Sequence, residues 1–111
     1  MILTIQDHPD YEITEYGEVI SCKNKGYRVL LPDCSNGYPR VTLDGEKRYL
    51  ADIVAEYFLK PKPDPKYKLF YIDGNKLNCR ANNLVWLSES DIKRYSQYTP
   101  EYRIQVLGEW A

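Results

Sequence analysis

LFYIDGNKLNCRANNLVW, residues 69–86, is the stretch of sequence that decides the fold. Short apolar runs typical of β-strands lie at its two ends, KLFYI (68–72) and NLVWL (83–87). The residues between them are rich in Asn, Asp and Gly, which favour turns and loops over regular structure. Asp73-Gly74 is a good turn by itself. The stretch therefore predicts two strands joined by a loop.

The chain before this stretch is predicted to form an antiparallel β meander. Its apolar runs are short and rich in Tyr, Val, Ile and Leu, and Gly-bearing turns separate them at regular intervals. Asp44-Gly45 is the clearest hairpin turn among them. The predicted strands are residues 11–13, 17–22, 27–31, 38–43 and 47–50.

Three helices are expected, each with its own signal. Residues 51–59 place their apolar side chains on one helical face, and the following PKPDP stops the helix. Ser88-Glu89-Ser90-Asp91 resembles a capping box and opens a helix to about residue 95. Thr99-Pro100 starts a last helix that runs to residue 107. This order of elements predicts an α+β fold with segregated strands and helices.

The bulk composition is that of a soluble protein with one modest core. The chain has 111 residues, 43% of them hydrophobic, and no apolar run long enough to span a membrane. No signal peptide is visible, so we expect a cytoplasmic protein. The three cysteines form no pairs with metal-site spacing, and only one histidine is present, so reduced thiols are expected.

Charge is more informative by position than in total. The net charge is −1, which argues against a protein whose function depends on non-specific contacts with phosphates. Residues 1–22 hold five acids and no Lys or Arg, whereas residues 60–80 hold six bases against two acids. The basic segment is suited to a polyanion, but a solvated loop has the same composition.

Tyrosine is unusually frequent, with 11 residues. Tyr serves binding surfaces well, because it offers a large contact area with a polar tip. It is also a strand former, and we expect the strand-and-core role to account for most of these residues.

Two blocks of the sequence resemble phage and mobile-intron HNH endonucleases that carry an N-terminal nuclease-associated modular domain. DYEITEYGEVIS (10–21), NGYPRVTL (36–43) and LADIVAEYFL (50–59) resemble the module, and YIDGNKLNCRANNLVW (71–86) resembles the HNH core. The resemblance implies a β-rich modular region (residues 1–60), a degenerate HNH ββα element (61–97) and a C-terminal helix (98–111). We expect these parts to form one compact unit.

The resemblance also implies a site whose catalytic groups have been replaced. In the family, a histidine takes a proton from water, and a metal is held by a carboxylate or amide before it and by an Asn on the following helix. The corresponding positions here are Tyr71, Phe70 and Ile92. We therefore expect that the chain is not an enzyme and needs neither metal nor cofactor. The surviving frame residues are Asp73, Gly74, Asn78, Asn83 and Trp86, and Trp86 is expected in the core.

Two functions are compatible with such a frame. The first is a DNA-binding or regulatory protein that docks on a duplex through its basic residues. The second is a protein-binding effector that inhibits a host or defence protein handling nucleic acid. Neither involves a membrane or a small-molecule substrate, and the resemblance implies the cytoplasm of an infected bacterium. The candidate nucleic-acid or partner-binding residues are Lys60, Lys62, Lys66, Lys68, Lys76, Arg80, Lys93 and Arg94.

Overall fold

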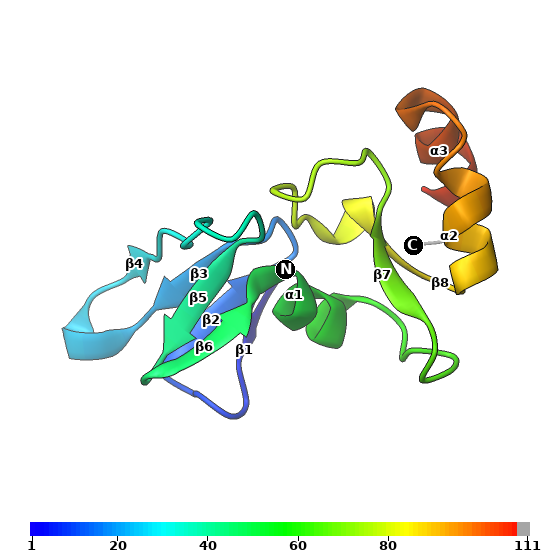
Figure 1. The fold of residues 1–111 in the computed structure, drawn as a ribbon. Helices are drawn as coiled ribbons and strands as arrows, with labels where there is room; N and C mark the ends of the chain where they lie inside the picture. Colours follow the sequence, from blue (N-terminus) through cyan, green and yellow to red (C-terminus); the bar gives the residue numbers. More distant parts are fainter. Residues whose placement is uncertain (109–111) are drawn as a thin grey trace.

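The computed structural model describes residues 1–108 and has an elongated shape of 47 × 27 × 23 Å. Figure 1 shows a larger lobe of short strands with helix α1 at its inner end, and a smaller lobe made of β7, β8, α2 and α3. Strands and helices are segregated, so the predicted α+β fold is confirmed. Among the described residues, no helix has the length and apolar character needed to cross a membrane.

The larger lobe contains a four-stranded antiparallel meander and a separate hairpin. In the meander the strands lie in the order β1-β2-β3-β4, and the hairpin pairs β5 with β6. One isolated bridge, between Asp33 and Arg40, connects the intervening loop to β5. The predicted single meander is therefore divided, because the loop after β4 diverts the chain. The bounds are β1 Ile2–Thr4, β2 Tyr11–Thr14, β3 Val19–Ser21, β4 Arg28–Val29, β5 Arg40–Leu43 and β6 Glu46–Tyr49.

The turn between β5 and β6 follows the predicted hairpin chemistry. Asp44 and Gly45 have φ angles of 51° and 89°, and such a pair of positive angles matches the right-handed twist of the flanking strands. Helix α1, Leu50–Phe58, begins directly after this hairpin and buries five of its residues. The hairpin and α1 together form one wall of the cleft described below.

The smaller lobe is built on the antiparallel pair β7, Lys68–Tyr71, and β8, Leu84–Leu87. Helix α2, Glu89–Tyr95, is capped by Ser88 Oγ, which accepts from the Asp91 amide at 3.3 Å. Helix α3, Pro100–Leu107, is capped in the same way by Thr99. Both helix starts are where the sequence predicts them. Single 3₁₀ turns lie at Lys23–Lys25 and Ala81–Asn83.

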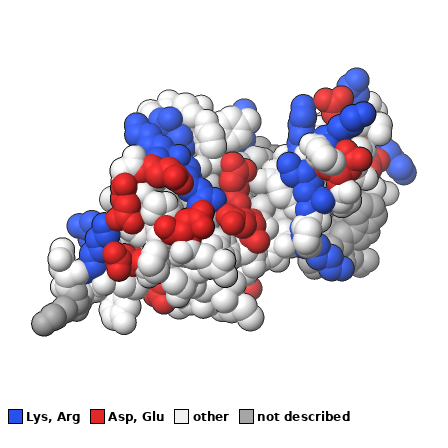
Figure 2. Space-filling view, turned by 90° about the horizontal axis from the view of Figure 1, so that it is seen from below, with Lys and Arg blue, Asp and Glu red and all other residues white. Residues whose placement is uncertain are grey.

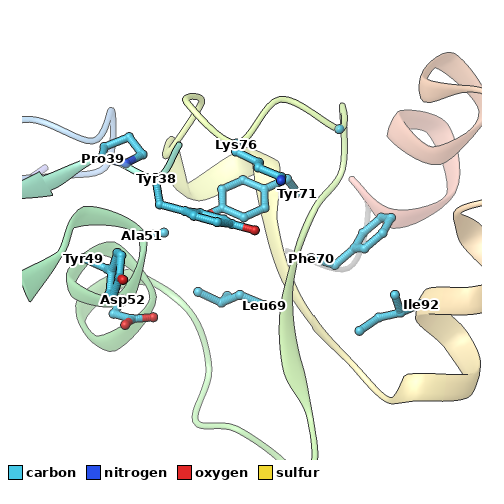
Figure 3. A pocket seen from close by; sticks show the side chains of 11 residues that line it. Tyr38, Pro39, Tyr49, Ala51, Asp52, Leu69, Phe70, Tyr71, Lys76 and Ile92 are labelled. Atoms are coloured by element: carbon cyan, nitrogen blue, oxygen red, sulfur yellow. The ribbon is translucent and has the colours of Figure 1, made fainter. Parts of the chain in front are cut away.

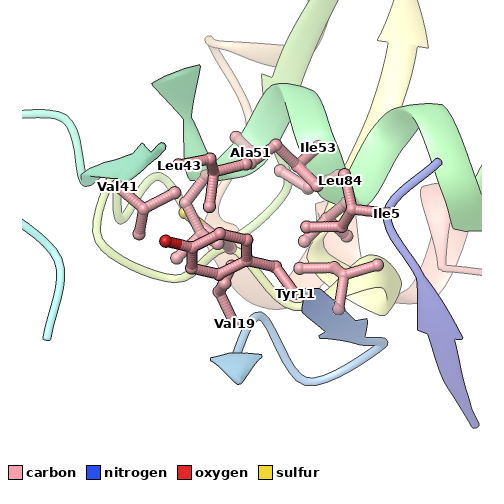
Figure 4. Packing of buried hydrophobic residues seen from close by; sticks show 12 residues of the cluster. Ile5, Tyr11, Val19, Val41, Leu43, Ala51, Ile53 and Leu84 are labelled. Atoms are coloured by element: carbon pink, nitrogen blue, oxygen red, sulfur yellow. The ribbon is translucent and has the colours of Figure 1, made fainter. Parts of the chain in front are cut away.

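Two cores lie on opposite faces of the β7–β8 pair. Alternate residues of a strand point to opposite faces, so Leu84 enters one core while Val85 and Leu87 enter the other. Figure 4 shows the larger core, with side chains from the strands of the larger lobe packed against α1. This first core contains Ile5, Tyr11, Ile13, Val19, Val41, Leu43, Leu50, Ala51, Ile53, Val54, Cys79 and Leu84. The second core contains Ile72, Val85, Leu87, Tyr95 and Leu107.

Candidate nucleic-acid interface

The loop between β7 and β8 is held by a closed network of side-chain hydrogen bonds. Asn83 is buried; its amide nitrogen donates to Asp73 Oδ1 at 2.9 Å and to the Asn78 carbonyl at 3.0 Å. Its oxygen accepts from the Asp73 amide at 2.9 Å. Asn78 Nδ2 donates to the second carboxylate oxygen of Asp73 at 2.9 Å. The Asn and Asp residues of the predicted frame therefore hold one another and the loop backbone.

The Asp73 carboxylate is favoured in its charged form. Burial alone would raise its pKa, but hydrogen bonds from Asn78, from the Asn75 amide and from Asn83 outweigh burial and lower the pKa. Because these bonds occupy both oxygens, the carboxylate serves to shape the loop.

Gly74 follows with a φ of +79°, a conformation that Gly adopts at little cost. A Cβ at this position would lie 3.1 Å from the terminal nitrogen of Arg103, a residue that the sequence did not single out. Arg103 is buried, and its guanidinium donates to the carbonyls of Ile72 at 2.7 Å and Tyr98 at 3.1 Å. Helix α3 is thus attached to the loop that carries the frame residues.

A cleft of about 440 Å³ opens between the larger lobe and β7. It contains all three positions predicted for catalytic groups, Phe70, Tyr71 and Ile92, together with Gly74 and Lys76. Figure 3 shows that Tyr71 points toward the larger lobe, whereas Phe70 and Ile92 lie on the other side of β7. This division follows from the alternation of side chains along a strand. The other lining residues are Tyr38, Pro39, Tyr49, Ala51, Asp52 and Leu69.

Tyr71 is held as a neutral phenol. Burial is the main cause that raises its pKa to about 12, and nearby Cys79, Tyr38 and Asp52 act in the same direction. Its ring lies 6.3 Å from that of Tyr38. At neutral pH this side chain offers an aromatic face and a hydroxyl group, and it is not a proton acceptor of the histidine kind.

The predicted metal positions do not fit a divalent cation. Phe70 and Ile92 carry no donor atom, and Mg²⁺ requires oxygen ligands in near-octahedral geometry. Within residues 1–108, no group of three or more His, Cys, Asp or Glu side chains is arranged to hold a metal.

The predicted basic residues are all exposed, and the structure places them in several groups. Lys60 and Lys62 lie at Trp86, whose indole nitrogen donates to the Lys60 carbonyl at 3.2 Å and whose ring lies 5.0 Å from Lys62 Nζ. Trp86 is half-buried beside Pro61 and Pro63, so the expectation that it belongs to the core is wrong. Alternation along β8 places Trp86 on the face of Leu84, opposite Val85 and Leu87 of the second core, but Trp86 lies outside the first core.

The remaining bases are spread over both ends of β7 and over α2. Lys66 and Lys68 lie beside the start of α2, where Lys68 Nζ pairs with Glu89 at 3.2 Å. Lys93 is exposed on that helix. Lys76 lies over the Tyr38 ring in the cleft, Arg80 over the Tyr16 ring and Arg94 over the Tyr95 ring.

In the larger lobe, several bases form ion pairs with acidic side chains. Lys23 pairs with Asp44, Arg40 with Asp33, and Arg48 with Glu56. These pairs neutralise much of the positive charge in that part of the chain. Of the eight predicted bases, by contrast, Lys68 alone pairs with an acid within 4 Å among the described residues.

The chain is similar to known proteins in both sequence and fold. The NUMOD4 motif matches residues 4–44. An uncharacterized HNH endonuclease of Acanthamoeba polyphaga mimivirus is 30% identical over 83 residues, which are 72% of this chain and 21% of that protein. The solved structure of the HNH homing endonuclease I-HmuI, described as showing DNA binding and cleavage, matches with a TM-score of 0.70 at 23% identity. That match covers 87% of this chain and 58% of the I-HmuI chain.

These matches correct one expectation drawn from the sequence. Both relatives carry the name of an HNH endonuclease and therefore point to a nuclease, so the expectation that the chain is not an enzyme is wrong. The chain spans about a fifth of the mimivirus protein and less than two thirds of I-HmuI. The modular motif, the relative and the shared fold agree with the resemblance of residues 10–86. The chain carries a NUMOD4 motif at residues 4–44, is similar in sequence to an HNH endonuclease and shares the fold of an HNH homing endonuclease.

Proposed function

We propose that the chain is a DNA-binding protein of the HNH endonuclease type. Its docking element would be the HNH-like region, residues 61–97, together with Lys60 before it. The observation that carries the proposal is the set of eight exposed bases between residues 60 and 94, of which Lys68 alone pairs with an acid among the described residues. Exposed bases without acidic partners are available to phosphate oxygens, and such contacts supply most non-specific affinity for DNA.

Local charge supports this proposal although the net charge of the chain is −1. Residues 60–94 hold eight Lys and Arg against four Asp and Glu. In the view of Figure 2, Lys and Arg side chains surround much of the smaller lobe, while acidic side chains gather at the middle of the larger lobe. A duplex is therefore expected to approach the smaller lobe and to be repelled from the acidic part of the larger one.

The protein-binding effector is not proposed further, since no described contact, charge group or cavity favours it over DNA. A phage origin and an infected bacterium as the site of action stay predictions. The mimivirus relative supports a viral origin in the broader sense.

The test is fluorescence anisotropy of a mixed-sequence duplex titrated with the protein at low and at physiological salt. We expect micromolar binding that weakens steeply with salt, because displaced counterions accompany every phosphate contact. Flat anisotropy at both salt concentrations would overturn the proposal.

A matched pair of variants locates the interface. Lys66→Gln with Lys93→Gln should weaken binding and lower the salt slope by about 0.9 for each phosphate that the variant no longer neutralises. Lys47→Gln with Arg28→Gln removes the same charge from exposed positions of the larger lobe and should leave affinity within about twofold. An equal weakening of binding in the two variants would contradict docking through the smaller lobe.

Cleavage is the activity that the names of the relatives indicate, and it needs its own measurement. The protein is incubated with supercoiled plasmid and Mg²⁺, and conversion to open-circular DNA is followed against an EDTA control. Metal-dependent conversion would extend the proposal from binding to nicking. Plasmid that stays supercoiled at saturating protein would limit it to binding.

A further inference from the structure

The tyrosines contradict the expectation that the strand-and-core role accounts for most of them. Only Tyr11 and Tyr95 are buried among the described residues. Six others have exposed side chains: Tyr16, Tyr27, Tyr38, Tyr49, Tyr98 and Tyr102. Large aromatic rings left in solvent gain nothing from burial, so a binding role is the better explanation for those that gather in one place.

Three tyrosines gather in the cleft beside β7. The Tyr38 ring lies 6.3 Å from Tyr71 in a tilted arrangement and 6.3 Å from Tyr49 in an edge-to-face arrangement. Tyr38 and Tyr49 remain 36% and 42% exposed, so part of each side chain stays open to a ligand. Figure 3 shows Tyr38 and Tyr71 close together on the larger-lobe side of β7, with Asp52 and Leu69 beneath them.

We infer that this cleft receives one unpaired nucleobase of a bound DNA strand, which stacks on the Tyr38 ring. This inference rests on the proposed function, because it assumes that the chain binds DNA. Stacking on aromatic side chains is the usual way in which proteins hold single-stranded bases. The cleft volume of about 440 Å³ is within the range of small-molecule sites, so one base and its sugar have room.

The polar groups of the cleft suit a nucleotide. Lys76 Nζ lies 5.0 Å from the centre of the Tyr38 ring, where it can meet the phosphate attached to a base stacked nearby. Asp52 supplies a carboxylate that accepts N–H groups from a base edge. Burial in the cleft raises the pKa of Asp52, while Arg48 and Lys62 nearby act in the opposite direction. The walls thus offer an aromatic face, an acceptor and surrounding positive charge.

An organic cation is the other ligand that aromatic rings and a carboxylate can hold. Lys76 argues against it, because this ammonium group already lies over the Tyr38 ring. A second cation would meet that charge, whereas a nucleotide brings a negative phosphate to it. Charge complementarity therefore favours the nucleotide.

The experiment compares two labelled duplexes of the same sequence, one fully paired and one with a single bulged nucleotide, by anisotropy at physiological salt. Base–aromatic stacking predicts that the bulged duplex binds at least about fivefold more tightly. Tyr38→Leu should abolish this preference and leave affinity for the paired duplex within about twofold, whereas Tyr38→Phe should retain it. Tyr27→Leu removes a tyrosine that is 81% exposed and lies outside the cleft, and it should also retain the preference.

The outcomes separate this inference from the proposed function. Salt-dependent binding of both duplexes with equal affinity would overturn the nucleobase site and leave the DNA-binding proposal standing. A preference that survives in Tyr38→Leu would also overturn it, because the bulge would then be bound elsewhere. Absence of binding to either duplex would overturn both.

Discussion

Arg103 Nε donates to the backbone carbonyl of Ile72 at 2.7 Å and thereby joins α3 to the end of β7. The same guanidinium donates to the carbonyls of Tyr95 at 3.4 Å and Tyr98 at 3.1 Å, which end α2 and begin the corner after it. It also lies over the Phe70 ring at 5.5 Å. One buried side chain therefore fixes the positions of three elements around the frame loop.

Arg103→Met should lower the free energy of unfolding by about 2–3 kcal/mol, since it leaves buried carbonyls without donors. Urea denaturation followed by circular dichroism measures the change. Arg103→Lys should not restore stability, because an ammonium group lacks the planar fork that reaches several carbonyls at once. Arg28→Met, at an exposed position in β4, is the control and should change stability by less than about 0.5 kcal/mol.

Asp73 should make stability depend on acid pH. Its pKa is lowered in the folded state from the ordinary value of 3.8, so its contribution is present above about pH 4 and is lost as pH falls through the folded pKa. Asp73→Asn should therefore be less stable than the native chain near pH 7, and the difference should shrink at about pH 3. Urea midpoints at both pH values test this. Asp7→Asn, at an exposed position, serves as the comparison, and the same pH trend there would contradict the assignment.

Three glycines separate the cost of backbone conformation from the cost of contact. Gly17 has a φ of +80°, and a Cβ there would lie 3.0 Å from the Cys79 carbonyl oxygen. Gly37 has a φ of +88° but nothing within 4 Å, and Gly26 has neither restriction. Gly37→Ala should cost about 1 kcal/mol, Gly17→Ala distinctly more, and Gly26→Ala close to nothing, all by thermal or urea unfolding. Equal losses of stability in Gly17→Ala and Gly37→Ala would show that the contact with Cys79 relaxes at little free-energy cost.

The assignment of residues 70 and 92 to the metal-ligand positions of an HNH site can be tested by introducing oxygen ligands there. Phe70 and Ile92 lie on the same side of β7 and pack against the second core, so Phe70→Asp with Ile92→Asn should create affinity for Mn²⁺, measured by isothermal titration calorimetry. Leu77→Asp with Ile104→Asn introduces the same groups at exposed positions and should bind no more metal than the native chain. A folded double variant without metal affinity would contradict the assignment of residues 70 and 92.

Local sequence signals predicted the elements well where the chemistry of a turn or cap decides them. Asp44-Gly45, Ser88 and Thr99-Pro100 each act as their side chains predict. The α+β class and the two strands around the frame loop followed from the same kind of signal. Strand β1 was not predicted, because three residues at a chain end carry too little pattern, and it forms through pairing with β2.

Features that depend on tertiary packing were not accessible in this way. Arg103 looks like a solvent-facing residue of a polar helix, yet it is buried because three carbonyls converge on its position. Trp86 looks like a core residue, yet it is only half-buried, lies beside Pro61 and Pro63, and donates to the Lys60 carbonyl. The cleft required residues from the segment before β5, from β6, α1, β7 and α2 to come together, and no single stretch of sequence contains that arrangement.

The β7–β8 pair places its two faces in different cores, and this limits how the gene can change. A single-residue insertion within residues 84–87 would turn the side chains on one side of it to the opposite face, so residues of one core would face the other. Codon insertions and deletions in this strand should therefore be strongly selected against. The exposed segment 61–66 carries no such constraint, and length variation among descendants of this gene should accumulate there.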